Sequence, residues 1–196
     1  MIVSRETSER LQIYADLIRR WNPRINLIAP STLPDLESRH IDDCLQLCNI
    51  INPLDGNWVD LGSGGGLPGI VLAAAFNDRP LLFHLVESDQ RKSAFLRTAA
   101  REMGLDKVKI HNSRIEQLDP LNAAYMSARA LAPLPKLMPY LAHHLAADGT
   151  ALLMKGRKWQ SELVEARQIW RFDVRVHNST TEEGAATLEV SGVSHV

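Results

Sequence analysis

The sequence has few of the features that mark membrane, secreted or disulfide-bonded proteins. Its apolar stretches are far shorter than the roughly 18 to 20 residues of a membrane helix, and residues 1–5 lack the apolar region of a signal peptide. Only two cysteines occur, Cys44 and Cys48, and no second Cys or His pair stands at zinc-binding spacing. These absences predict a cytoplasmic protein with buried thiols, no disulfide framework, no metal site and no membrane partner.

The chain also lacks an excess of charge of either sign. Its formal net charge is -1, so any attraction to nucleic acid has to come from a local basic patch. Internal repeats, low-complexity tracts and long structureless linkers are absent as well. With 196 residues and 45% hydrophobic content, the chain can bury one substantial core, which favours a single α/β unit with a small appendage.

Residues 1–52 are predicted to form an N-terminal helical extension. Residues 5–21 carry apolar side chains at spacings of three and four, namely Leu11, Tyr14, Ile18 and Trp21. Asn22-Pro23 is expected to end this first helix. A second helix is predicted over residues 38–50, with Ile41, Leu45 and Cys48 on one face.

Residues 53–196 are predicted to form an α/β core, because short apolar runs alternate there with helical patterns. The expected strands are 58–61, 81–87, 107–111, 125–128, 150–154, 172–176 and 187–190. The clearest helix follows Ser88 as its N-cap and ends at Gly104. No helix separates the last two strands, so we expect a mostly parallel seven-stranded sheet whose last strand is antiparallel.

A glycine-rich loop over residues 60–70 follows the first expected strand and opens a helix, which is where a nucleotide-like cofactor binds. The spacing of Gly64, Gly66 and Gly69 is compatible with NAD and with S-adenosylmethionine. Two residues favour S-adenosylmethionine. Asp60 can bond a cationic amino-acid group, and Pro68 removes a backbone donor from a would-be pyrophosphate site.

Further candidates follow the next three strands, at the sheet edge where open α/β folds bind ligands. Glu87 can accept hydrogen bonds from both ribose hydroxyls of either cofactor. Ile115 and Glu116 are candidates for holding adenine, although a short capped helix with an exposed Glu116 gives the same pattern. Arg129 is a candidate functional residue, with a surface ion pair as the alternative.

Several motifs occur together in a characteristic order. They are Trp21-Asn22, Asn26-Leu27-Ile28, Arg39-His40-Ile41-Asp42-Asp43, residues 60–69, Arg91-Lys92 before Phe95-Leu96, Ser113-Arg114-Ile115-Glu116, Ser127-Ala128-Arg129-Ala130 and Lys155-Gly156. Over essentially the whole chain, this set resembles the RsmG (GidB) family of 16S ribosomal RNA guanine-N7 methyltransferases. The resemblance implies a class I Rossmann-like methyltransferase fold and a monomer acting on 16S RNA, alone or within the 30S subunit.

The resemblance also implies a cofactor and a reaction. The cofactor would be S-adenosylmethionine, and the product S-adenosylhomocysteine. The cofactor contacts implied by the family are Gly62, Leu67, Ile115, Glu116 and Arg129, to which the residue pattern itself adds Asp60, Gly64, Gly66 and Glu87. The methyl acceptor would be N7 of guanine 527 in the standard RNA numbering.

Guanine N7 carries an unprotonated lone pair, so its methylation needs positioning rather than a nucleophile or an obligatory base. The expected positioning residues are Arg129, His40 and Lys155, and the expected RNA-binding residues are Asn26, Arg39, His40, Arg91, Lys92, Lys155, Arg157 and Lys158. Taken alone, His40 is also compatible with a packing role, and Arg157 and Lys158 with solvated surface. A small-molecule methyltransferase and an NAD-dependent oxidoreductase are the alternatives. An oxidoreductase would need a catalytic Tyr-Lys pair or a catalytic His, and the chain offers neither near the ends of its expected strands.

Overall fold

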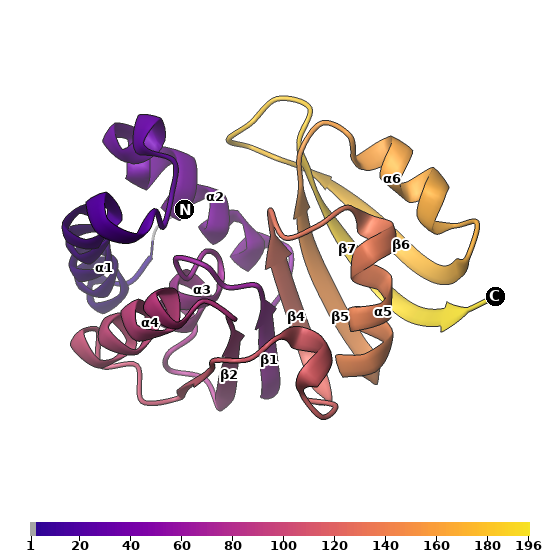
Figure 1. The fold of residues 1–196 in the computed structure, drawn as a ribbon, viewed down its shortest axis with the longest axis horizontal. Helices are drawn as coiled ribbons and strands as arrows, with labels where there is room; N and C mark the ends of the chain where they lie inside the picture. The colour runs from indigo at the N-terminus through magenta and orange to yellow at the C-terminus, as the bar shows by residue number, and fades with distance from the viewer. Residues whose placement is uncertain (1–2) are drawn as a thin grey trace.

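The computed structural model describes residues 3–196 and contains one seven-stranded sheet with helices on both faces (Figure 1). The strands are β1 (Gly56–Leu61), β2 (Leu81–Val86), β3 (Val108–His111), β4 (Ala123–Arg129), β5 (Leu145–Lys155), β6 (Trp170–Asn178) and β7 (Ala186–His195). Their order is β3-β2-β1-β4-β5-β7-β6. The first five are parallel to one another, whereas β7 is antiparallel to its neighbours β5 and β6. The predicted fold class is therefore confirmed.

Helices cover the two faces of this sheet unequally. They are α1 (Arg5–Ile25), α2 (Asp42–Leu45), α3 (Gly69–Ala75), α4 (Gln90–Glu102), α5 (Leu134–His144) and α6 (Trp159–Ala166), with short 3-10 helices at Pro30–Asp35, Gln46–Asn49 and Ile115–Gln117. The first four pack on one face, and α5 and α6 on the other (Figure 1). Within residues 3–196, no helix combines the length and hydrophobicity needed to cross a membrane.

The first helix ends later than the sequence predicts: α1 continues to Ile25, and Pro23 lies inside it. Proline removes one backbone donor but has a helix-compatible φ angle, so the last turn can continue past it. The helix ends instead at Asn26, which adopts the left-handed conformation with φ 47°. The side-chain oxygen of Asn22 then accepts hydrogen bonds from the N–H groups of Leu27 (2.8 Å) and Ile28 (2.9 Å) and turns the chain.

Two other local predictions need correction. The expected helix over residues 38–50 is helical throughout but irregular: a π-helix at Glu37–Ile41 precedes α2, and a 3-10 helix follows it. The N-cap of α4 is Asp89 rather than Ser88, since the Asp89 carboxylate accepts hydrogen bonds from the N–H groups two and three residues later. The predicted end of α4 is confirmed, with Gly104 at φ +63°.

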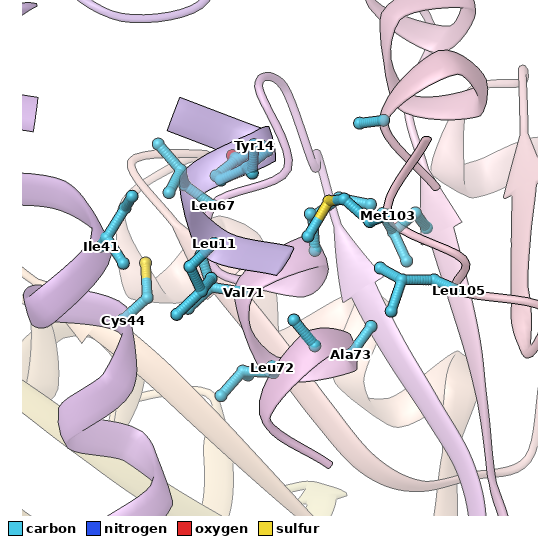
Figure 2. Packing of buried hydrophobic residues seen from close by; sticks show 14 of the residues in the cluster. Leu11, Tyr14, Ile41, Cys44, Leu67, Val71, Leu72, Ala73, Met103 and Leu105 are labelled. Atoms are coloured by element: carbon cyan, nitrogen blue, oxygen red, sulfur yellow. The ribbon is translucent and has the colours of Figure 1, made fainter. Parts of the chain in front are cut away.

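The N-terminal helices share one buried core with α3 and α4. Figure 2 shows this packing around Leu11 and Tyr14 of α1, Cys44 of α2, and Val71 of α3. Both cysteines are free thiols; Cys44 is buried as expected, whereas Cys48 is only partly buried. The boundary between residues 52 and 53 stays a prediction, because apolar side chains from both sides of it belong to the same cluster.

Candidate active site

The loop between β1 and α3 needs glycine at several positions for different reasons. A Cβ atom at Gly62 would lie 2.5 Å from Leu131, and one at Gly66 would lie 2.6 Å from Ile70, so both glycines allow close packing. Gly64 has φ +55°, and within residues 3–196 a Cβ there would meet, apart from its chain neighbours, only the Gly62 carbonyl oxygen, at 3.8 Å. The backbone at Gly64 is therefore open to a ligand.

Several hydrogen bonds hold this loop in place. The N–H of Ser63 donates to the Val86 carbonyl (3.0 Å), and the N–H of Gly64 donates to Glu87 Oε2 (2.8 Å). The N–H of Gly66 donates to the Ser63 carbonyl (2.6 Å). The buried hydroxyl of Tyr14 donates to the Gly65 carbonyl (2.5 Å). The other Glu87 oxygen accepts from a backbone N–H at 2.7 Å, so its carboxylate has a defined orientation.

A cavity of about 450 Å³, here called the inner cavity, opens beside the loop. Seven of the nine predicted cofactor residues line it: Gly62, Gly64, Leu67, Glu87, Ile115, Glu116 and Arg129. Ile115 is held there by His144, whose Nε2 atom lies 3.2 Å from the Ile115 carbonyl oxygen. The structure thus brings three strand ends and the glycine loop together around one space.

Asp60 is the main exception among the predicted cofactor residues. It is fully buried beneath the loop, where the Ser127 hydroxyl donates to its Oδ1 at 2.6 Å, and it does not line the inner cavity. Burial raises the pKa of Asp60 to about 6, although the hydrogen bond from Ser127 opposes the rise. A Cβ at Gly69 would lie 2.6 Å from Oδ2, so Asp60 contacts the loop backbone where we expected it to contact a ligand.

Arg129 lies at the centre of a side-chain network beside the inner cavity. Its Nη1 atom donates to Asp43 Oδ2 at 3.2 Å, and its Nη2 atom donates to His40 Nδ1 at 3.0 Å. Because a guanidinium only donates, His40 Nδ1 accepts, and its Nε2–H donates to Thr32 Oγ1 at 2.8 Å. Burial, and then the charge of Arg129, lower the pKa of His40 to about 4. His40 is therefore neutral at physiological pH.

A second cavity of about 850 Å³, here called the outer groove, adjoins the inner cavity, and Arg129 and Ala130 line both. Its walls come from residues 39–46, from residues 154–158 at the end of β5, and from residues 179–187, which form the connection after β6 and the start of β7. The last segment reaches toward the N-terminal helices (Figure 1). It is attached to them because the Thr181 hydroxyl donates to Asp43.

The family model described as rRNA small subunit methyltransferase G matches residues 7–190 of this chain. The chain belongs to this family. It is 57% identical over 195 residues to Ribosomal RNA small subunit methyltransferase G of Paracoccus denitrificans, covering 100% of both chains. It is 50% identical over 196 residues to the protein of the same name from Ruegeria pomeroyi, covering 99% of this chain and 95% of the relative.

Solved structures with a similar fold are much more distant in sequence. A SAM-dependent methyltransferase from Aquifex aeolicus has a TM-score of 0.61 at 12% identity and covers 93% of this chain and 98% of its own. The glycopeptide N-methyltransferase MtfA complexed with (S)-adenosyl-L-methionine has a TM-score of 0.62 at 12% identity, with 78% and 93% covered. Because both identities are low, the similarity to these structures concerns the fold alone.

The structure places the predicted RNA-facing residues of this methyltransferase G chain in three groups. Arg39, His40, Lys155, Arg157 and Lys158 line the outer groove. Lys92 lines the inner cavity instead. Asn26, at the C-cap of α1, and Arg91, at the start of α4, are exposed and line neither.

Lys155 has less freedom than a typical RNA-contacting lysine. Its ammonium lies 2.7 Å from Glu162 Oε2 and donates to the Ala132 carbonyl at 2.7 Å, and its side chain is only 9% exposed. The same Glu162 oxygen accepts from the N–H of Leu134, the first residue of α5. Lys155 therefore helps to fix the loop after β4, which carries Ala130.

Three contributors to the site were missed at the sequence level. Tyr14 has only the signature of a core position in an amphipathic helix, and nothing local indicates that its hydroxyl meets Gly65. Asp43 lies three residues after His40, just beyond the π-helix Glu37–Ile41, and nothing local indicates that it pairs with Arg129. Ala130 adopts φ 52°, which is unusual for alanine and has no sequence signal.

Proposed function

We propose that this chain transfers the methyl group of S-adenosylmethionine to N7 of a guanine in 16S ribosomal RNA, guanine 527 by resemblance. The transfer would release S-adenosylhomocysteine. Membership of the methyltransferase G family supports methyl transfer to small-subunit ribosomal RNA. The observation that carries the proposal is that the inner cavity and the outer groove meet at Arg129, because the two reactants of a direct displacement must be brought into contact.

The inner cavity fits the chemistry of S-adenosylmethionine. Gly64 leaves its backbone open to the cavity, and the oriented carboxylate of Glu87 can accept hydrogen bonds from ribose hydroxyls. Ile115 supplies an apolar wall suited to an adenine ring. When bound there, the cofactor supplies an electrophilic methyl group on a sulfonium. Asp60 would support the loop from beneath rather than touch the cofactor.

Arg129 is the best placed of the candidates for orienting the guanine. A guanidinium carries five N–H donors, and the bonds to Asp43 and His40 use two of them. A remaining N–H can hold guanine O6, which lies beside N7 on the same edge of the base. His40 would act by holding Arg129, since its neutral ring already accepts the Arg129 hydrogen bond. Asp43 would offset the positive charge that methylation places on the purine.

The outer groove would hold the RNA strand. Arg39, Arg157 and Lys158 are exposed on its walls and can contact phosphate oxygens, which positions the strand without reading its sequence. Arg91 and Asn26 would extend this contact outside the groove. We further propose that the protein acts as a monomer in the cytoplasm, on RNA alone or on the 30S subunit.

Labelled methyl transfer to 30S subunits and to protein-free 16S RNA tests this function, with N7-methylguanine mapped by borohydride and aniline cleavage. We expect one modified guanine. Arg129→Lys keeps the charge but replaces the rigid planar fork that bonds Asp43 and His40 with a single ammonium on a flexible stem, so kcat should fall by about tenfold, the equivalent of about 1.4 kcal/mol. Arg101→Lys, at an exposed position of α4, is the matched control. Cofactor binding without methyl transfer to either RNA would overturn the proposal.

A further inference from the structure

The ring of Tyr14 is rigidly held inside the protein, although it comes from the N-terminal helix. Its side chain is fully buried, and its ring centroid lies 6.4 Å from that of Phe95 in α4. Figure 2 shows Tyr14 within the buried cluster that joins α1 to the core. Burial raises the pKa of the Tyr14 phenol well above 10, so the hydroxyl keeps its proton and remains a donor.

This hydroxyl meets the glycine loop at the peptide group that links Gly65 and Gly66. The carbonyl of that peptide accepts from Tyr14, and its N–H donates to the Ser63 carbonyl, so both polar ends are fixed. Fixing them matters because glycine peptides have more conformational freedom than others. Leu27, which follows α1, adds a second restraint, since its Cβ lies 3.2 Å from the position of a Cβ at Gly65.

We propose that Tyr14 is a positioning residue for the cofactor, and that the N-terminal helix thereby forms part of the cofactor site. The proposal rests on the proposed binding of S-adenosylmethionine in the inner cavity. Gly64, which faces that cavity, immediately precedes the fixed peptide and is itself bonded to Glu87. Without the Tyr14 hydroxyl, the loop samples more conformations, and the cofactor has to select the competent one.

Tyr14→Phe removes only the hydroxyl and keeps the ring packing. The lost hydrogen bond to Gly65 stabilises the ordered loop by about 1 kcal/mol. We therefore expect an approximately fivefold higher Kd for S-adenosylhomocysteine by calorimetry. The KM for S-adenosylmethionine should rise similarly, while kcat at saturating cofactor stays near the parent value. Tyr125→Phe is the matched control, because its hydroxyl accepts only a 3.4 Å bond from Leu54 and does not touch the loop. A lower Tm with an unchanged Kd would show a structural role alone and overturn the proposal.

Hydrogen exchange without any ligand separates this proposal from the proposed function. The backbone N–H groups of residues 62–67 should exchange faster in Tyr14→Phe than in Tyr125→Phe. Exchange could be faster in Tyr14→Phe while the parent protein does not bind S-adenosylhomocysteine. This outcome would refute the cofactor assignment and leave only the contact between Tyr14 and the loop. Should Tyr14→Phe fail to fold, NMR of the parent protein decides. S-adenosylhomocysteine should shift the ring signals of Tyr14 more than those of Tyr125, and equal shifts would refute the positioning role.

Discussion

Asp60→Asn tests how the buried carboxylate beneath the glycine loop affects stability. Burial raises the pKa of Asp60 from 3.8 to about 6, because the charged form has lost its water. The folded protein therefore binds this proton more tightly than the unfolded chain does. Stability from the protonated form is fully present below pH 3.8 and is lost as the pH rises through 6. Above pH 6 the ionised carboxylate costs about 3 kcal/mol.

Asparagine removes the charge and keeps an oxygen that can accept the hydrogen bond from Ser127. The free energy of unfolding of Asp60→Asn minus that of the parent should thus increase with pH, by about 2 kcal/mol between pH 4.5 and 7. Urea unfolding at a series of pH values measures it. Folding lowers the pKa values of His40 and His84 to about 4, so these two histidines make stability rise with pH in the parent and in the variant alike. Subtracting the two free energies of unfolding removes this shared contribution. A difference that stays constant over this pH range would refute the buried-charge argument.

Two further substitutions examine the backbone around the inner cavity. Ala130→Gly should raise Tm, because glycine relieves the left-handed conformation at φ 52°, which contributes about 1 kcal/mol. Ala128→Gly in β4 is the control and should lower Tm. Equal effects of the two substitutions in thermal unfolding would contradict the backbone strain at Ala130. Gly64→Asp should abolish binding of S-adenosylhomocysteine in calorimetry, because a side chain and a second carboxylate enter beside Glu87. Gly104→Asp should bind normally: Gly104 also has a positive φ, but among the described residues nothing beyond its chain neighbours lies within 4 Å of its Cβ position. Retained binding by Gly64→Asp would show that the loop does not hold the cofactor.

The elements that the sequence predicts well depend on short-range patterns. Each of the seven expected strands overlaps an observed strand, because short apolar runs bounded by turn residues are of strand length and too short for a typical helix. The glycine loop was recognisable for the same reason. Glycine at a strand-to-helix turn indicates close backbone approach without reference to any distant residue.

Errors occurred where neighbouring signals compete within two or three residues. Ser88 and Asp89 can both cap a helix, and in the structure the Asp89 carboxylate accepts the hydrogen bonds from the first turn. Pro23 is a common helix terminator, yet the carbonyl of Asn22 and the left-handed Asn26 define the actual end. Such choices differ by small local energies, which packing of the helix against the core can reverse.

Short-range patterns in the sequence specify the succession of strands and helices along the chain, the position of the glycine loop, and the residue types at the carboxyl ends of the strands. The contacts that those residues make depend on tertiary packing. Tyr14 meets Gly65 across 51 residues, and Arg129 meets Asp43 across 86. Asp60 turned out to be buried, and Lys155 to be paired with Glu162. Periodicity assigns a side chain to a face, whereas the partner on that face depends on how distant elements pack, and this information is not local.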